Sequence, residues 1–335
     1  MLPFLGKIGS IFIPTMPVFW CLGYLAGTAS FIILASRAGL HMGRVLNFLA
    51  LTIVASAIGA RVSAVLLLSR PEGLHWFFEH PGEIFKFWKS GFSLYGVLFF
   101  GSLTGLWYTL RNSLPVWRTA DIAVPGMGLG HAIQSFGDFL AGAHPGWPTG
   151  LPWGISIHHW NFRGLKGVPL HPVMLYIAAL ALFGYLSAWA WLQARDHPGE
   201  KFFLSWLYYP VIRILKLKLF DGELFFVGGA FYATFRFFIE FFRDPRTLIW
   251  YPDFPLPQTQ VACICFFLVC LGWYLALRAI GETEQKGLPD RLWMKLCFRL
   301  AAGLRWLAQN VPWPVTGDRK PETRNRLEGR ENGNN

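Results

Sequence analysis

Seven long apolar segments constrain this sequence more than any other feature. Each is long enough to cross a bilayer, and they fall at residues 15–36, 45–68, 92–111, 119–142, 171–194, 222–242 and 259–279. Inside hydrocarbon a helix satisfies all of its own backbone hydrogen bonds. Hydrophobic residues make up 53% of the chain and charged residues 15%, which leaves too little polar surface to cover a soluble globule. The sequence therefore predicts an all-α polytopic membrane protein with seven transmembrane helices.

Lysine and arginine gather in alternate connections between these segments. The first connection holds Arg37 and Arg44, the third holds Arg111 and Arg118, and the fifth is also basic. Because cytoplasmic loops carry an excess of basic residues, we expect the N-terminus outside and the C-terminus in the cytoplasm. We expect a membrane domain at 1–280 with external loops at 69–91, 143–170 and 243–257.

The last part of the chain has a different composition. Arg291, Lys295 and Arg299 recur every four residues beside a leucine stripe, which is typical of an amphipathic helix on a membrane surface. We expect a cytoplasmic amphipathic helix at 281–312. Residues 313–335 contain almost no apolar side chains and are predicted to be disordered.

The charge balance indicates the kind of partner. The chain has 30 basic and 19 acidic residues, giving a net charge of +11. In a membrane protein this excess favours anionic membrane lipids, and a nucleic-acid partner is not expected. The 5 cysteines include no pair with the spacing of a zinc site or a disulfide framework. We expect neither a metal nor a cofactor.

The fourth apolar segment is the richest in polar side chains. Its stretch from residue 123 to 146 contains several glycines together with His131, Gln134, Ser135 and Asp138. A polar group in hydrocarbon is costly, so such residues normally face protein or a polar cavity. The glycines allow close approach of another helix or of a lipid head group.

Other polar residues stand in or beside the remaining segments. Arg236 and Glu240 are four residues apart, hence on one helical face, and this pairing alone would also suit helix packing. An isolated arginine can reach the membrane interface, and an isolated tyrosine can belong to an aromatic belt. By the predicted topology, however, these groups share one depth near the external leaflet, which favours a common pocket for a phospholipid head group. The other members of this set are Arg61, Tyr95, His171 and Tyr176.

These stretches resemble the prolipoprotein diacylglyceryl transferase family. The resemblance covers about residues 15–279 and is carried by six motifs in the family's order. They are IGARVSAVLL at 58–67, GFSLYG at 91–96, DIAVPGMGLGHAIQSFGDFLAG at 121–142, VPLHPVMLY at 168–176, FYATFRFFIEFFR at 231–243 and LPQTQVACI at 256–264.

The resemblance implies an activity and a location. Family members are multi-pass enzymes of the bacterial inner (cytoplasmic) membrane. They move a diacylglyceryl group from phosphatidylglycerol to the lipobox cysteine thiol of a prolipoprotein signal peptide and release glycerol phosphate. Arg236 and Glu240 match a functional arginine and its acidic partner, Gln260 matches a glutamine of the seventh span, and Tyr95 falls where members carry His or Tyr.

The candidate site combines these matches with the polar residues found above. The expected catalytic residues are Tyr95, Arg236 and Glu240. The expected substrate-binding residues are Arg61, His131, Ser135, Asp138, His171, Tyr176 and Gln260.

The chain also departs from the family motifs. Ser135 stands where the family has an arginine, Asp138 replaces Asn or Cys, Met174 replaces a glutamine, Ile177 an acidic residue, and Ala143 a further motif position. Losing a guanidinium donor can cost about 2.7–4 kcal/mol at a transition state.

Compensation would have to come from elsewhere in the chain. The candidates are His131, one helical turn before Ser135, and Arg163 or Lys166 in the following loop. Two hypotheses stay open: an active transferase, and a degenerate paralogue that binds lipid or lipoprotein without turnover. A lipid transporter is a weaker third alternative.

The predicted topology can be tested with single cysteines in a cysteine-free background. We expect a cysteine at Gly329, in the tail, to resist a membrane-impermeant maleimide in intact spheroplasts and to react after permeabilisation. A cysteine at Gly150, in the predicted external loop, should react in intact spheroplasts and serves as the control. Labelling at position 329 from the outside would contradict the topology.

Overall fold

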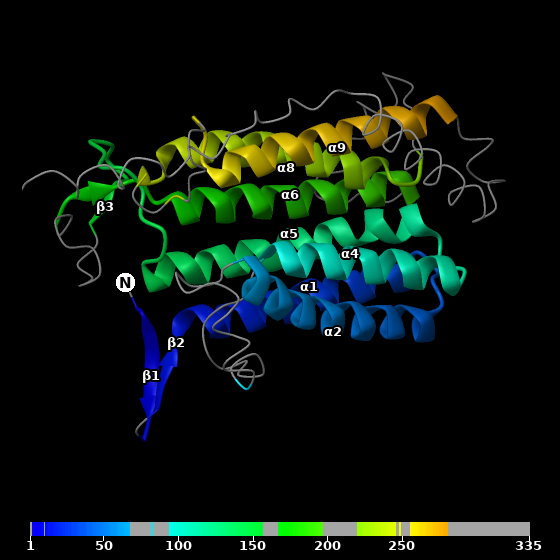
Figure 1. The fold of residues 1–335 in the computed structure, drawn as a ribbon, viewed down its shortest axis with the longest axis horizontal. Helices are drawn as coiled ribbons and strands as arrows, with labels where there is room; N and C mark the ends of the chain where they lie inside the picture. Colours follow the sequence, from blue (N-terminus) through cyan, green and yellow to red (C-terminus); the bar gives the residue numbers. More distant parts are fainter. Residues whose placement is uncertain are drawn as a thin grey trace, which may run out of the picture. The chain divides into compact units, whose positions relative to one another are not determined.

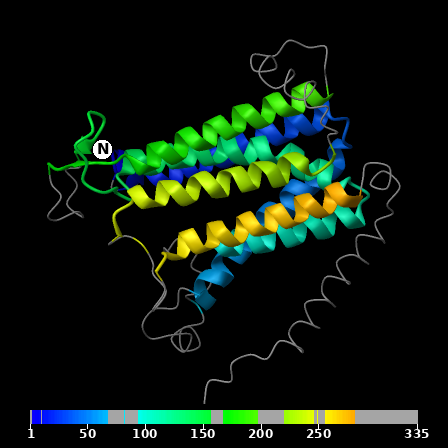
Figure 2. The ribbon, with the colours of Figure 1, turned by 90° about the horizontal axis from the view of Figure 1, so that it is seen from above.

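The structure, a computed structural model, describes residues 2–9, 11–67, 82, 94–156, 167–196, 220–245, 248 and 255–280. Long helices dominate this part of the chain and lie side by side (Figures 1 and 2). They are α1 (Thr15–Arg37), α2 (Met42–Leu67), α4 (Leu94–Arg111), α5 (Val116–Ala141), α6 (Val173–Asp196), α8 (Glu223–Ile239) and α9 (Gln258–Ile280). A short 3₁₀ turn, η2 (Glu240–Phe242), continues α8.

Each of the seven predicted segments coincides with one of these helices to within a few residues. Five described stretches are long and apolar enough to cross a membrane: α1, α2, α6, α8 with η2, and α9. The other two, α4 and α5, are not among them. The predicted segments 281–312 and 313–335, and all of the 69–91 loop except Gly82, lie outside the described residues.

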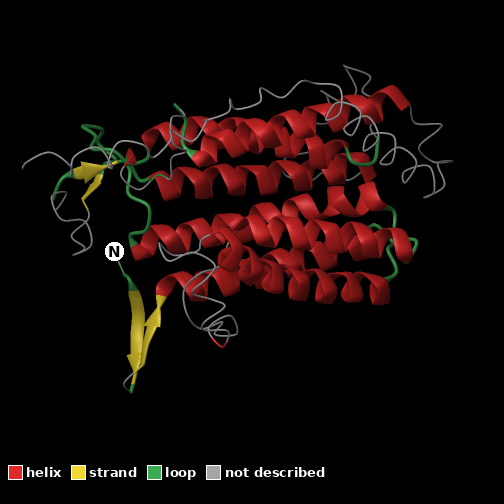
Figure 3. Ribbon diagram, viewed as in Figure 1, coloured by secondary structure: helices red, strands yellow, loops and turns green. Residues whose placement is uncertain are grey.

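The described chain is mainly helical, as expected, and also contains two small hairpins that the all-α expectation did not include (Figure 3). Strands β1 (Phe4–Ile8) and β2 (Ile11–Pro14) pair antiparallel before α1, and Gly9 at their turn has a positive φ of 61°. Strands β3 (Ile155–Ser156) and β4 (Pro169–Leu170) pair after α5. Both hairpins lie outside the long apolar segments, and β2 and β3 contain β-branched isoleucines, which favour strands.

Helices α1 and α5 pack through glycines. A Cβ atom added at Gly23 would lie 2.5 Å from the carbonyl oxygen of Gly130, and one added at Gly27 would lie 2.6 Å from that of Gly126. Gly23 and Gly27 are four residues apart in α1, and Gly126 and Gly130 are four residues apart in α5. This spacing places the two glycines of each helix on one face. The interpretation of these glycines as packing residues therefore applies to Gly126 and Gly130. No larger residue fits there at this separation.

A buried apolar cluster lies beside this contact, at the end of the bundle away from the hairpins. It brings together residues of α1, α2, α5, α6 and α8, which are Phe31, Leu34, Ala35, Val45, Ile122, Ala188, Leu192 and Leu224. We call this end of the bundle the Asp121 end, after the carboxylate described next.

Asp121 of α5 is fully buried and joins three segments of the chain. Its carboxylate accepts hydrogen bonds from the backbone N–H groups of Gly222 at 2.8 Å and Phe225 at 2.9 Å, and pairs with Arg195 of α6 at 3.1 Å. Helix α8 has no side-chain cap of its own at Gly222. The Asp121 carboxylate, which belongs to α5, thus accepts hydrogen bonds from amides that the start of α8 leaves unpaired. Its negative charge also lies at the positive end of the α8 dipole, which is a stabilising arrangement.

The glycine contact predicts an unequal response to alanine. We expect Gly126→Ala to lower the free energy of unfolding by about 1–3 kcal/mol, because the added Cβ meets a backbone oxygen that cannot move alone. Gly184→Ala in α6 is the matched control: its Cβ would meet nothing within 4 Å, so it should be neutral or slightly stabilising. Denaturant unfolding of the purified protein in detergent measures both. Equal destabilisation of the two variants would contradict the packing argument.

Candidate functional site

Two arginines share one buried carboxylate where α8 ends. Glu240 forms salt bridges with Arg236, one helical turn earlier, and with Arg243 at 3.1 Å, through different carboxylate oxygens. The Glu240 side chain is 1% exposed and each arginine side chain 12%. The helix tightens to η2 at Glu240, which brings Arg243 back onto the same carboxylate. The group, which we call the arginine cluster, carries one net positive charge in partly dehydrated surroundings.

His144 extends the arginine cluster toward the loop after α5. An arginine can only donate hydrogen bonds, so Nδ1 of His144 accepts from Nη2 of Arg243 and the ring proton sits on Nε2. The residue as a whole is exposed, but protein packed around the ring withdraws water and, with the positive charges of Arg243 and Arg236, lowers the pKa of His144 to about 4. His144 is therefore neutral at physiological pH.

The end of α5 positions His144. Gly142 adopts a left-handed conformation with φ of 75°, and the N–H groups of Gly142 and Ala143 close the last turn on Phe139 and Asp138. The chain then crosses the end of α8. Asp244 N–H donates to the carbonyl of Pro145 at 3.1 Å, and Trp147 N–H donates to that of Phe242 at 2.8 Å. We call this end of the bundle the head end. Its loops are residues 142–156, 167–172 and 242–245.

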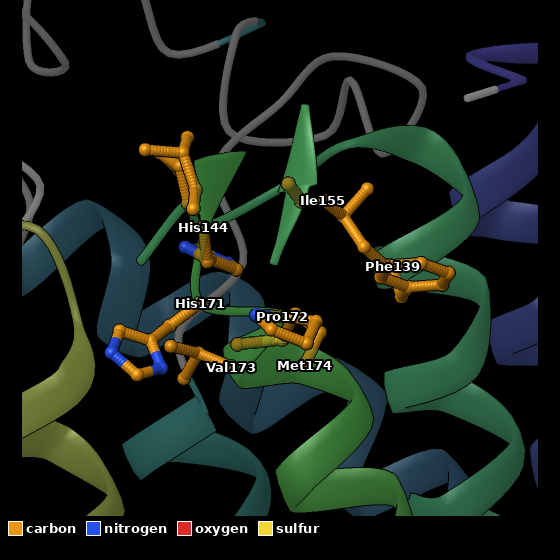
Figure 4. A pocket seen from close by; sticks show the side chains of 10 residues that line it. Phe139, His144, Ile155, His171, Pro172, Val173 and Met174 are labelled. Atoms are coloured by element: carbon orange, nitrogen blue, oxygen red, sulfur yellow. The ribbon is translucent and has the colours of Figure 1, made fainter. Parts of the chain in front are cut away.

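A second group of aromatic and polar side chains lies at the head end beside a pocket. The Tyr176 hydroxyl accepts a hydrogen bond from Nε1 of Trp153 at 2.9 Å and lies 3.1 Å from Nδ1 of His171. The pocket is lined by residues from the end of α5, the loop after it and the start of α6, including Phe139, His144 and His171 (Figure 4).

Deeper in the bundle, α5 and α8 meet through His131 and Tyr232. Nε2 of His131 lies 2.7 Å from the Tyr232 hydroxyl, and Arg236 stands one helical turn further along α8. This contact between α5 and α8 therefore lies one helical turn from the arginine cluster.

The remaining candidate residues occupy separate positions. Gln260 of α9 is 2% exposed and donates to the backbone carbonyl of Phe237 at 3.2 Å, between Arg236 and Glu240 in sequence. Asp138 accepts from Nε1 of Trp20 of α1 at 2.9 Å. Ser135 is 2% and Arg61 6% exposed.

Tyr95 is the second residue of α4, and its side chain lies outside the described part of the structure, as do Arg163 and Lys166. Three residues that now stand out, Tyr232, Arg243 and His144, were absent from the candidate list. Arg243 could have been found from its spacing of three to Glu240, which places both on one face of a helical turn. The other two depend on contacts across about 100 positions.

Two of the departures from the family motifs lie together in an apolar environment. Met174 and Ile177 are buried with Val173 and pack against Phe139 and Ile239. Apolar side chains therefore surround Met174 and Ile177, which stand where the family motifs have a glutamine and an acidic residue. Among the described residues, no three His, Cys, Asp or Glu side chains are placed to hold a metal ion.

Comparison with known proteins points to one family. The profile of the family described as prolipoprotein diacylglyceryl transferase matches residues 3–217. Proteins named phosphatidylglycerol–prolipoprotein diacylglyceryl transferase are similar to the chain. The one from Geobacter sulfurreducens is 28% identical over 279 residues, covering 80% of this chain and 92% of its own length. That from Bacillus mycoides is 24% identical over 284 residues, covering 82% and 93%. That from Nitratidesulfovibrio vulgaris is 28% identical over 249 residues, covering 74% and 81%. The protein belongs to the prolipoprotein diacylglyceryl transferase family.

Proposed function

We propose that this protein transfers the diacylglyceryl group of phosphatidylglycerol to the cysteine thiol of a prolipoprotein signal peptide in a bacterial inner membrane. The observation that carries the proposal is the arginine cluster, in which Arg236 and Arg243 share the buried carboxylate of Glu240. The names of the curated relatives supply the reaction and its two substrates.

The arginine cluster suits the phosphate of the lipid. Its net charge is positive, and guanidinium groups bind phosphate oxygens in a fork geometry. The Nε–H of Arg243 is buried and has no hydrogen-bond partner within the described residues. A buried donor without a partner is costly, and a phosphate oxygen would satisfy it.

The same charges suit the chemistry. The thiol sulfur attacks the glyceryl carbon, the bond from that carbon to its phosphate oxygen breaks, and glycerol phosphate leaves with a greater negative charge. Donors fixed around that oxygen stabilise the charge as it develops. Arg243 provides a second guanidinium beside Arg236, although Ser135 has replaced the arginine expected in α5.

The membrane arrangement is also part of the proposal. Seven spans cross the bilayer, the head end faces the external side, and residues 281–312 and 313–335 form the cytoplasmic amphipathic helix and the disordered tail. The start of α1, the end of α5, the start of α6 and the end of α8 share the head end, as alternating spans require; contacts between Trp20 and Asp138 and between Arg243 and His144 support this. Tyr95, Arg61, Ser135, Asp138, His171, Tyr176 and Gln260 remain proposed site residues.

A second candidate function is supported by a different observation. Ser135, Met174 and Ile177 replace polar family positions and are all buried, the last two in an apolar cluster. A paralogue that binds phosphatidylglycerol or lipoprotein without turnover would tolerate such a repacked wall. Transfer by the wild-type protein distinguishes the two functions.

The proposed role of Arg236 can be tested in proteoliposomes containing phosphatidylglycerol and a lipobox peptide. We expect wild-type transfer, read as the peptide's mass increase, and a fall in kcat of about 100-fold to 1,000-fold in Arg236→Ala, because one donor to the leaving phosphate is lost. Arg236→Lys should recover only part of the rate, since it keeps the charge but not the fork.

The matched control is Arg278→Ala in α9, which removes an exposed arginine paired with Tyr274. Its transfer rate should equal that of the wild type. Wild-type turnover that persists in Arg236→Ala would refute the phosphate role of the arginine cluster. Phosphatidylglycerol binding by a wild-type protein that transfers nothing would favour the paralogue.

A further inference from the structure

His144 is held in an unfavourable backbone conformation. Its φ is 53°, in the left-handed region that glycine adopts freely and most other residues avoid. The chain around it is tied to the end of α8, because Asp244 N–H donates to the carbonyl of Pro145 and Gly146 pairs with Arg243 as an isolated β-bridge. Glycine would suit this backbone better, so the presence of a histidine calls for a reason in its side chain.

That side chain holds one end of the Arg243 guanidinium. Nδ1 of His144 accepts a hydrogen bond from Nη2, while Nη1 donates to Glu240 at 3.1 Å. The two acceptors come from different segments of the chain, the loop after α5 and the end of α8. A guanidinium is planar and rigid, so fixing its two terminal nitrogens also fixes the direction of its third nitrogen, Nε.

Nε of Arg243 is the donor that this arrangement leaves over. It is buried, and within the described residues it has no hydrogen-bond partner. A buried donor without a partner is costly, and a guanidinium that was free to turn would satisfy it. Glu240 and His144 together prevent that turn. His144 also lines the pocket at the head end, so the fixed guanidinium lies next to that opening (Figure 4).

Resting on the transferase function proposed above, we propose that His144 is a positioning residue that keeps the Nε–H of Arg243 directed at the phosphate of the substrate lipid. A neutral imidazole suits this role because it accepts a hydrogen bond without cancelling the net positive charge of the arginine cluster. A carboxylate at position 144 would cancel it. Donors that are fixed before the reaction need no reorganisation as charge develops on the leaving oxygen, so His144 acts on the rate more than on lipid affinity.

Two substitutions separate the side chain of His144 from its backbone. His144→Asn keeps an acceptor near the position of Nδ1 and tolerates a positive φ, whereas His144→Gly suits the backbone and removes the acceptor. In the proteoliposome assay we expect His144→Gly to lower kcat by at least about tenfold and to change the KM for phosphatidylglycerol by less than about threefold, because a small misplacement of a catalytic group is enough to slow the reaction. His144→Asn should stay within about threefold of the wild-type kcat.

The matched control for the backbone is Ser113→Gly, between α4 and α5, where the φ is also 53°. Its transfer rate should equal that of the wild type. In an Arg243→Ala background, His144→Gly should cause less than about a twofold further loss, because His144 acts only through Arg243. Unfolding midpoints in detergent show whether His144→Gly has kept its fold. If it has not, His144→Phe, which keeps a ring but has no acceptor, takes its place.

The outcomes separate the two proposals. If His144→Gly transfers as fast as His144→Asn, or loses as much rate without Arg243 as with it, His144 only shapes the loop. Either result would overturn the positioning inference, while the transferase function stands. A wild-type protein that modifies no peptide would overturn the proposed function itself, and this inference with it.

Discussion

The close contact between α1 and α5 is the constraint on which the rest of this structure depends. Gly23 and Gly27 leave no room for any side chain against Gly126 and Gly130, so the two backbones approach to the limit that sterics allow. Helix α5 is thereby held on one side, and its other side is free to contact α6 and α8. The polar contacts that α5 makes with other helices in the candidate site are therefore made by a helix whose position is fixed.

Helix α8 is in turn held by α5 at both of its ends. At its start, the Asp121 carboxylate accepts from the amides of Gly222 and Phe225. At its end, the chain that follows α5 pairs with residues 242–244, and His144 accepts from Arg243. Because the two ends are fixed to the same helix, the intervening Tyr232 and Arg236 keep a defined register against His131. A site that depends on such a register does not need flexible loops to assemble it.

The sequence was sufficient for features that depend on neighbours along the chain. Apolar length located the helices to within a few residues, and a spacing of four paired Arg236 with Glu240. It was insufficient where contacts depend on helix rotation and register. The partners His131 and Tyr232 are 101 positions apart, and no local pattern marks Tyr232 among the aromatic residues of its helix. The hairpins were missed because they lie in short stretches that hydropathy over a membrane span does not detect. The role of Asp121 as a cap for another helix was missed for the same reason as Tyr232.

The shared carboxylate has a consequence for how the proposed reaction ends. A phosphodiester such as phosphatidylglycerol carries one negative charge, whereas a phosphate monoester carries up to two and is attracted more strongly by the same pair of cations. Two unopposed guanidinium groups would therefore retain the product longer than they retain the lipid. Glu240 occupies one face of both Arg236 and Arg243 and competes with any anion that approaches them. In the proposed reaction Glu240 would act as a permanent internal competitor. It would weaken the affinity for both phosphates and shorten the residence of the more highly charged one, so that the next round of catalysis could begin.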